Sequence, residues 1–373
     1  MSKTLRAALV AAATPFALAA VAPSAALAGG IERTPQSMEI LFAPGRQVQF
    51  SLGAVRPRAS GTSPLTPGVS SGNVFGRYLQ PEIAVKWSLN DRLDAALILD
   101  RPFGARTRYP EGTGYFLAGS TASINSEALT GVLRYRLDGG VGVHGGIRLQ
   151  QLCCDARVRT ATGLDYRLET PTSRAAGYLV GVSWERPDIA ARVALTYNSA
   201  VRHRFDDATE EIAGLVPTQP GPFRTTTPES VNLEFQTGIA PDTLLFGSVR
   251  WARWSRFEIA PPLYAQAVGG ALTSYDSNVV TYRLGLGRRF NETWSGAVTA
   301  LYEPRSGDVV SNLGPRDGRK GLGVAATWST GPYSVTGGLQ YQRLGRATTF
   351  APTSARFSGG SLMAAGVRVA VSF

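Results

Sequence analysis

The last stretch of the chain, residues 367–373, reads VRVAVSF and decides the fold. Successive side chains of a strand point to opposite faces, so the three valines and Phe373 fall on one face. Arg368, Ala370 and Ser372 fall on the other face. The stretch therefore predicts a β-strand with one apolar and one polar side, which is the pattern of a wall between two different surroundings.

The same alternation returns in three stretches further back. In residues 93–100, apolar positions alternate with Asp94, Ala96 and Asp100, and residues 133–137 and 141–150 set leucine, valine and tyrosine against arginine and histidine. An arginine that faces lipid near the bilayer midplane costs about 2 to 4 kcal/mol, so the apolar faces are predicted to meet lipid and the arginines to line a lumen. Aromatic residues near the strand ends are expected in girdles at the membrane surfaces: Tyr135, Trp184, Trp294, Tyr302 and Tyr333.

The connections between such strands alternate between short and long. Six short ones carry turn-forming residues, at 90–91, 138–140, 186–188, 240–242, 291–292 and 331–332. Seven longer polar or Gly/Pro-rich ones lie at about 59–78, 103–120, 154–174, 201–226, 258–276, 304–317 and 346–358. Thirteen connections join fourteen strands, and short periplasmic turns opposite long extracellular loops are typical of bacterial outer-membrane barrels. The sequence thus predicts an all-β fold, a transmembrane antiparallel β-barrel of about 14 strands.

The two ends of the chain agree with export to the outer membrane of a Gram-negative bacterium. Lys3 and Arg6 precede an apolar core and Ala26-Leu27-Ala28 follows it, which is the order of a secretory signal peptide cleaved near Ala28. A short membrane anchor is the alternative for residues 1–28. Beyond residue 28, no apolar run approaches the roughly 18 residues that a spanning helix needs. Ending on an aromatic residue, Phe373, within an alternating strand is typical of outer-membrane barrels.

Composition limits the other classes of protein. The chain has 42 glycines, 43% hydrophobic residues and a mean hydropathy of −0.04, a neutral average that conceals alternation. Its formal charge of +11 is carried mainly by dispersed arginines. Because there is no lysine-rich cluster or nucleic-acid motif, we expect anionic lipid or an anionic substrate as the partner rather than nucleic acid. A soluble periplasmic sandwich is the competing all-β interpretation, but an ordinary sandwich does not often reach so many strands.

No motif for catalysis or metal binding emerges. The only histidines, His144 and His203, have no cysteine, histidine or carboxylate at metal-ligand spacing. Cys153 and Cys154 are adjacent and cannot close a sizeable loop, so we interpret them as incidental. We predict that the protein is not an enzyme and that it uses no metal and no cofactor.

Three stretches carry a resemblance to a known family. The third expected strand, residues 92–109, runs into Pro102-Phe103-Gly104; another strand ends in Trp254-Ser255-Arg256-Phe257; and residues 281–287 contain Tyr282 and precede Trp294 after a short turn. The second stretch is similar to W-S-x-F, and the third to a T-Y-R strand and its hairpin partner. Together, over most of residues 46–373, the chain resembles the FadL family of outer-membrane transporters for long-chain fatty acids and other hydrophobic compounds, including aromatic hydrocarbons.

The resemblance implies a mechanism for transport. A hydrophobic molecule is captured at the extracellular loops, enters the lumen and leaves sideways into the membrane through a break in the wall, while an N-terminal plug closes the barrel below. Pro102, Phe103 and Gly104 are the candidates for that break here, because proline removes a ladder donor and glycine permits a bend. The alternative is that these residues simply begin the loop.

The N-terminal segment departs from the family pattern. The family's plug is longer and bears an Asn-Pro-Ala motif, whereas here only Gly29 to Gly45 precedes the first strand and Ala43-Pro44-Gly45 is at best a remnant. We therefore expect a signal peptide at 1–28, a short plug-like segment at 29–45 and the barrel at 46–373.

Arginine is the natural partner of a fatty-acid carboxylate, because its fork matches the carboxylate bidentately. Strand parity makes Arg134, Arg136, Arg148 and Arg283 candidates for substrate binding. The alternative is that they pair with lumenal carboxylates such as Asp94 and Asp100.

The function predicted from the sequence is passive transport of long-chain fatty acids or aromatic hydrocarbons across the outer membrane, by a protein that we expect to be a monomer in contact with outer-membrane lipid. A general or anion-selective diffusion porin is the rival prediction.

Overall fold

The computed structural model describes residues 30–373. The expected signal peptide, residues 1–28, and Gly29 lie outside the described residues. The wall is a closed antiparallel barrel of 14 strands. In chain order the strands are β1 (Gln47–Ser63), β3 (Tyr78–Ser88), β4 (Leu93–Asp100), β6 (Thr121–Arg136), β7 (Val141–Arg159), β9 (Ser173–Arg186), β10 (Ala191–Asn198), β15 (Ser230–Ala240), β16 (Thr243–Ala252), β19 (Val279–Arg289), β20 (Trp294–Glu303), β22 (Arg319–Thr330), β23 (Tyr333–Leu344) and β25 (Arg356–Ser372).

Each wall strand pairs with the next one along the chain, and the last pairs with the first. The closing pair, β1 with β25, runs from Gln47 opposite Ser372 to Thr62 opposite Arg356. A closed ring leaves no strand edge exposed, which is the condition for a sheet to sit in lipid. The predicted fold class and number of strands are confirmed.

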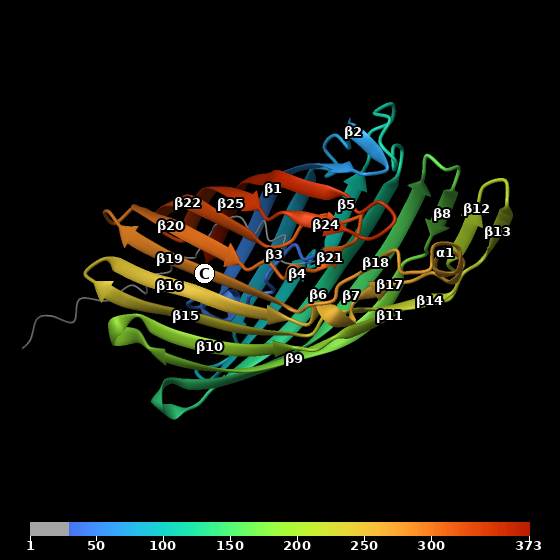
Figure 1. Cartoon of the computed structure of the whole chain (residues 1–373). Helices are drawn as coiled ribbons and strands as arrows, with labels where there is room; N and C mark the ends of the chain where they lie inside the picture. Colours follow the sequence, from blue (N-terminus) through green and yellow to red (C-terminus); the bar gives the residue numbers. More distant parts are fainter. Residues whose placement is uncertain (1–29) are drawn as a thin grey trace, which may run out of the picture.

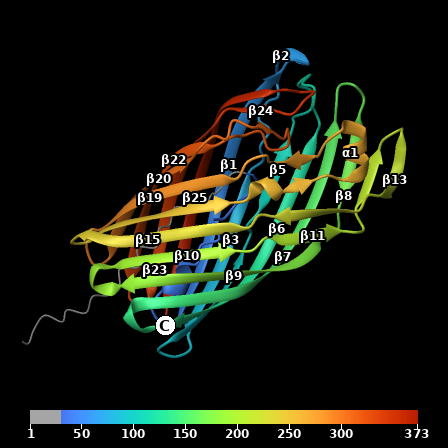
Figure 2. The same ribbon diagram turned by 60° about the horizontal axis from the view of Figure 1, so that its bottom comes forward.

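The two ends of the barrel differ as the connection lengths predict. All six expected short turns join neighbouring wall strands, and they gather at one end of the molecule (Figures 1 and 2). The long connections extend the opposite end with short elements: β2 (Thr66–Ser70), β5 (Gly104–Arg108), β8 (Asp165–Glu169), β11 (Val201–Phe205), β12 (Thr209–Ile212), β13 (Val216–Pro220), β14 (Phe223–Thr227), β17 (Glu258–Ile259), α1 (Pro262–Val268), β18 (Thr273–Ser274), β21 (Val309–Val310) and β24 (Ala347–Thr349). Among residues 30–373, no helix is long and apolar enough to cross a membrane.

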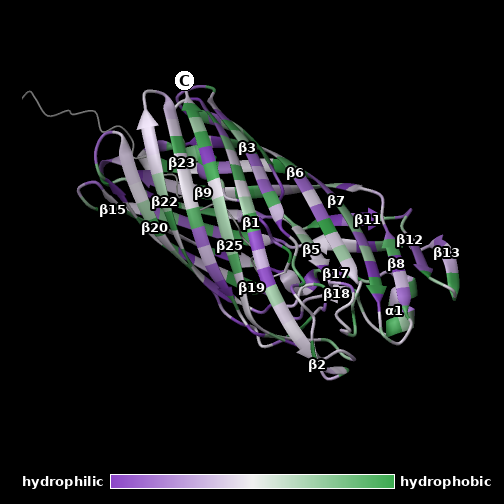
Figure 3. Cartoon of the chain, turned by 90° about the horizontal axis from the view of Figure 1, so that it is seen from above, coloured by the Kyte–Doolittle hydropathy of each residue, from purple (hydrophilic) through white to green (hydrophobic). Residues whose placement is uncertain are grey.

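The alternation of side chains follows the predicted parity. Leu97 is 43% exposed on the outside of β4, whereas its neighbours Ala96 and Ile98 are buried and Asp94 is 0% exposed. On β7, Ile147 and Leu149 are exposed while Arg148 is buried. Figure 3 shows the resulting banding of hydrophobic and hydrophilic residues along the strands. The expected girdle residues are all exposed on the outside: Tyr135, Trp184, Trp294, Tyr302 and Tyr333.

The interior is divided into two zones by its chemistry. Toward the long loops, a large apolar cluster includes Phe103, Trp254, Phe257, Tyr109 and Tyr166. Toward the short turns, the lumen is filled by residues 30–46, which include a 3-10 turn, η1 (Glu39–Phe42), by charged and polar side chains, and by a smaller apolar cluster around Met38 and Leu41. A hydrophobic molecule in the first zone therefore finds a polar barrier below it.

One expected strand boundary is wrong. The strand predicted to end in Trp254-Ser255-Arg256-Phe257 ends at Ala252, and Trp254–Arg256 forms a 3-10 turn, η4, that turns back into the lumen. Trp254 is completely buried, so its aromatic ring packs in the interior instead of extending the wall.

Candidate functional site: a break in the barrel wall

The wall is interrupted between β4 and β5. β6 is continuous and pairs with both of them, through residues 128–135 with β4 and residues 121–125 with β5. Between the two, Arg101 and Pro102 belong to neither strand, and Phe103 is tied back by Ser126, whose hydroxyl accepts from the Phe103 N–H and donates to its carbonyl, both at 2.8 Å. The stretch expected to be one strand, residues 92–109, is therefore two strands joined by a kink.

The strand on the other side of the kink, β3, also lacks a partner there. Its register with β4 begins at Ile83 opposite Leu99, and within the described residues Tyr78–Glu82 pair only with β1. Pro81 in β3 and Pro102 in the kink bring no N–H to a ladder. The wall thus has a gap in its backbone pairing between the start of β3 and the kink, with a proline on each side. The Gln80 side chain crosses it by donating to the Arg101 carbonyl at 3.0 Å, and the bridge between Phe75 and Thr107 limits it toward the long loops.

The N-terminal segment covers this gap from inside the lumen. Glu32 forms an isolated antiparallel bridge with Phe103. The Arg33 N–H donates to the Pro102 carbonyl at 2.7 Å, and the Gly104 N–H donates to the Ile31 carbonyl at 2.7 Å. The segment therefore uses the backbone groups that a continuous wall strand would have given to its neighbour.

The side chain of Arg33 fills the gap itself. Its Nε donates to the Gly104 carbonyl at 3.0 Å, and its guanidinium lies 4.4 Å from the centroid of the Tyr78 ring. Arg33 is only 4% exposed, and burial lowers the pKa of its guanidinium. A Cβ at Gly104 would overlap that guanidinium, so the glycine makes room for it. Arg33 therefore links the two edges of the gap, β3 and β5.

An aromatic cluster stands behind the gap. Trp254 contacts Phe103, Phe257 and Tyr275 edge-on, at centroid distances of 5.9, 5.4 and 5.2 Å. Gly30 packs so closely on the indole that a Cβ there would lie 2.6 Å from it. The break thus opens onto aromatic surface rather than onto water.

A small apolar pocket lies beside this cluster. Ile31, Ile124, Leu168, Ile259 and Tyr275 are among its lining residues, and its volume is ≈ 20 Å³, about the room that one water molecule needs. Within the described residues its lining includes Asp155 but no arginine or lysine. The pocket therefore has no room for a molecule larger than water unless its side chains move.

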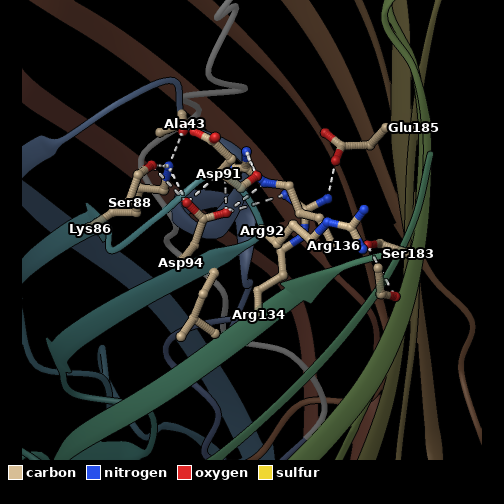
Figure 4. Close-up of polar contacts among 12 residues, drawn as sticks. Ala43, Lys86, Ser88, Asp91, Arg92, Asp94, Arg134, Arg136, Ser183 and Glu185 are labelled. Carbon is tan, nitrogen blue, oxygen red and sulfur yellow. Dashed lines mark hydrogen bonds and ion pairs between the residues drawn. The ribbon is translucent and has the colours of Figure 1, made fainter. Parts of the chain in front are cut away.

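The lower lumen holds the other end of the N-terminal segment in a charged network (Figure 4). The Lys86 ammonium donates to the carbonyls of Ala43 and Gly45 at 2.8 and 2.9 Å and pairs with Asp94 at 2.9 Å. Arg136 binds the same carboxylate. These contacts anchor the segment just before β1 begins.

The upper part of the segment is held by a second buried ion pair. Arg250 on β16 pairs with Glu32 and also donates to Ser230 at 2.9 Å. Burial raises the pKa of the Glu32 carboxyl, and the neighbouring Arg250 opposes that rise. Thr34 donates to Asp100 at 2.8 Å. The segment is therefore fixed on both sides of the break.

The four candidate arginines lie in the polar zone and not in the apolar pocket. Arg134 pairs with Glu185 and approaches Asp94 to 4.0 Å, and Arg136 pairs with Asp94. Arg148 donates to Thr130 at 3.1 Å and to Asn198 at 3.2 Å. Arg283 lines the lumenal cavity around residues 34–40 and has no hydrogen bond or ion pair among the described residues. The structure does not gather the four around one point, and their binding of a substrate stays a prediction.

The family-motif residues have different positions. Trp254 and Phe257 belong to the aromatic cluster. The Ser255 hydroxyl donates to the Asn278 amide oxygen at 2.8 Å near the start of β19. Tyr282 lies on the outside of β19, with its ring stacked on Tyr302 at a centroid distance of 6.5 Å. Trp254 and Phe257 thus lie behind the break, whereas Ser255 and Tyr282 contact residues of the wall.

The sequence alone did not identify three residues that lie in or beside the gap. Arg33, Tyr78 and Ser126 carry no motif, and their meeting depends on where the N-terminal segment runs. Pro81 did leave a signal, because a proline inside an otherwise regular strand marks an edge or an interruption.

Among residues 30–373, no group of three or more histidine, cysteine or acidic side chains could hold a metal ion. Cys153 and Cys154 are both free thiols. Cys154 is buried in the apolar cluster, whereas Cys153 points to the opposite face of β7.

A closed barrel with an apolar outside, a filled polar lumen and a break beside an aromatic cluster defines an outer-membrane transport barrel. Residues 7–306 match the family model described as outer membrane protein transport protein (OMPP1/FadL/TodX). The chain belongs to this family. No curated protein matches the sequence.

Solved structures show the same fold. A FadL homologue of Pseudomonas aeruginosa is 14% identical, with a TM-score of 0.72 over 90% of this chain and 92% of that one. The toluene transporter TodX of Pseudomonas putida is 12% identical, with a TM-score of 0.62 over 90% of this chain and 91% of that one. The toluene transporter TbuX of Ralstonia pickettii is 12% identical, with a TM-score of 0.63 over 95% and 98%.

Proposed function

We propose that the protein carries uncharged hydrophobic molecules, of the size of a monoaromatic hydrocarbon, from the extracellular loops into the membrane through the break between β3 and the kink at Arg101–Phe103. The observation that carries the proposal is the position of the break. It lies beside the apolar zone and above the Lys86–Asp94 network, so once Arg33 moves out of the gap, the sideways path leads from the apolar zone into lipid without entering periplasmic water.

Two further observations support an uncharged substrate. The described lining of the apolar pocket offers no arginine or lysine to pair with a carboxylate. Two of the similar solved structures are toluene transporters. Long-chain fatty acids are the second candidate, and Arg192 and Arg283 both line the lumenal cavity without a hydrogen bond or ion pair among the described residues, so both are open to a carboxylate.

A disulfide lock tests the sideways path. Glu32 and Phe103 face each other in a bridge whose hydrogen bonds flank them, and such pairs place Cα atoms at about 4.5 Å, within the range of a disulfide. The double variant Glu32→Cys and Phe103→Cys, made with Cys153→Ser and Cys154→Ala, would fix the segment over the gap. We expect uptake of radiolabelled toluene by whole cells to fall to the level of cells without the protein, and a reductant to restore it.

The oxidised and reduced forms of one variant are a matched pair, because both carry the same substitutions. The Glu32→Cys single variant controls for the loss of the partner of Arg250. Uptake that is equal in the two forms would refute the sideways path. Swelling of protein-containing liposomes in small sugars would instead support the diffusion porin, and faster uptake of oleate than of toluene would reassign the substrate to fatty acids.

A further inference from the structure

Five cations stand on the outside of the barrel in one continuous area, which we call the basic patch: Arg56, Arg58, Arg77, Lys320 and Arg343. Four belong to wall strands, where their sequence neighbours Val55, Pro57, Arg319, Gln342 and Leu344 are buried in the interior. Arg77 lies just before β3. The alternation of the strands therefore turns all four wall-strand cations away from the lumen.

The register of the strands brings these residues together. Lys320 on β22 lies opposite Arg343 on β23, and Arg343 and Arg58 lie on either side of Ser361 on β25. Arg56 is within electrostatic range of Arg58 and Arg77. The patch thus extends over four neighbouring strands, β22, β23, β25 and β1, and ends beside the gap, where Arg77 precedes Tyr78.

The basic patch lies at the edge of the apolar surface that covers the outside of the barrel. Toward the short turns, the next outward residues on the same strands are apolar or aromatic: Ala54, Leu322 and Tyr341. Met363, opposite both Arg56 and Tyr341, is 62% exposed. Beyond the patch, the chain enters the long loops. This is the level at which headgroups of the outer leaflet meet the acyl chains.

The cations of the patch lack acidic partners. Within residues 30–373, none of their side chains makes a hydrogen bond or an ion pair. By contrast, two arginines elsewhere on the wall are paired, Arg101 with Glu127 at 2.7 Å and Arg253 with Glu229 at 2.9 Å. The positive charge of the patch is therefore available to an external anion.

We propose that the basic patch binds the phosphate-bearing headgroup of an outer-leaflet lipid. Arginine forks pair with phosphate oxygens, and basic residues at a membrane surface attract anionic lipid. The apolar surface directly below the patch receives the acyl chains, which distinguishes a lipid from a soluble anion. The inference does not depend on what the lumen transports.

Native mass spectrometry of the full chain in detergent can test this with three probes: bis-phosphorylated lipid A, the same lipid with both phosphates removed, and inorganic phosphate. We expect retention of the phosphorylated lipid, at least tenfold weaker retention of the dephosphorylated one, and no retention of inorganic phosphate. Equal retention of the two lipids, or phosphate bound without lipid, would overturn the proposal.

A patch variant and a charge-matched control locate the site. The patch variant carries Arg56→Gln, Arg58→Gln, Arg77→Gln, Lys320→Gln and Arg343→Gln. The control removes five exposed cations elsewhere: Arg46→Gln, Arg92→Gln, Arg186→Gln, Arg204→Gln and Arg288→Gln. We expect at least tenfold weaker lipid binding in the patch variant and little change in the control. Should the fivefold variant fail to fold, the pair Lys320→Gln and Arg343→Gln replaces it, with a threefold loss expected. Unchanged binding in a folded patch variant refutes the site.

Discussion

Two junctions of the barrel wall, close to each other around the ring, are built in opposite ways. At the seam between β1 and β25, the first and last strands pair from Gln47 to Thr62 with one irregularity near Arg58. At the junction between β3 and β4, pairing covers only Ile83 to Ser88. The seam joins the strands that are most distant in sequence, yet its backbone pairing is much longer than that of the junction between β3 and β4. The gap therefore does not reflect difficulty in closing the ring; it lies where two prolines withhold their ladder donors.

The largest effect is expected behind the gap. Trp254→Ala removes a fully buried indole from the cluster that supports Phe103, and truncation of a buried tryptophan costs about 3 to 5 kcal/mol. Urea unfolding, followed by the heat-dependent shift in gel migration, measures the loss. Trp254→Phe is the control and should keep most of the stability. A negligible loss in Trp254→Ala would mean that the gap needs no support from inside.

The next largest effect is expected at the seam between β1 and β25. Ala365→Pro removes a donor between β25 and its neighbours, opposite Ala54 and Leu339, and leaves a carbonyl without a partner in lipid at a cost of about 1 to 3 kcal/mol. We expect the midpoint of urea unfolding to fall while toluene uptake per folded protein stays constant. Ala365→Val is the control. If uptake rises in the proline variant, any opening in the wall allows transport. That result would contradict the idea that the junction between β3 and β4 has a special role.

Removing the side chain that fills the gap should change the rate of uptake more than the stability of the barrel. Arg33→Ala removes the hydrogen bond to Gly104 and the contact with Tyr78. A charged hydrogen bond is worth about 1.5 to 3 kcal/mol, part of which offsets the burial of the charge, so we expect uptake to rise about three- to tenfold. Arg288→Ala, at an exposed arginine near the short turns, is the control. Uptake unchanged by Arg33→Ala would remove this side chain from the transport path.

The smallest effect is expected at Pro81. Pro81→Ala restores an N–H to β3, but within the described residues no strand stands opposite to accept it, so stability should change by less than about 0.5 kcal/mol. The measurement is again urea unfolding. A clear stabilisation together with reduced uptake would show that the proline alone holds the gap open, and that β3 and the kink pair once it is gone.

Most of the wall could be predicted from the sequence because its determinants are local. The period of two in residues 93–100 places Asp94 inside and Leu97 outside, and turn residues such as Asn90 and Gly139 mark the hairpins. The alternation of apolar and polar side chains along a single strand is enough to determine which of its faces meets lipid.

The site could be predicted only in part. Pro102 and Gly104 are visible as an interruption of a regular strand, and the structure has a break between β4 and β5 there. Arg33, Tyr78 and Ser126 could not be assigned, because their roles depend on the path of residues 30–46 through the lumen. Trp254 was expected at the end of a strand and instead turns inward, since burial of the indole against Phe103 outweighs continuation of the wall.

The anchoring of residues 30–46 inside the ring sets an order of assembly. This segment precedes every strand of the wall, yet it lies enclosed by all of them, with its contacts to Lys86, Glu234 and Arg250 distributed around the circumference. The ring closes only where β25 meets β1, so residues 30–46 must already lie inside it when the last strand pairs with the first. A chaperone that shields the early strands must therefore also leave the segment free to enter the unfinished ring.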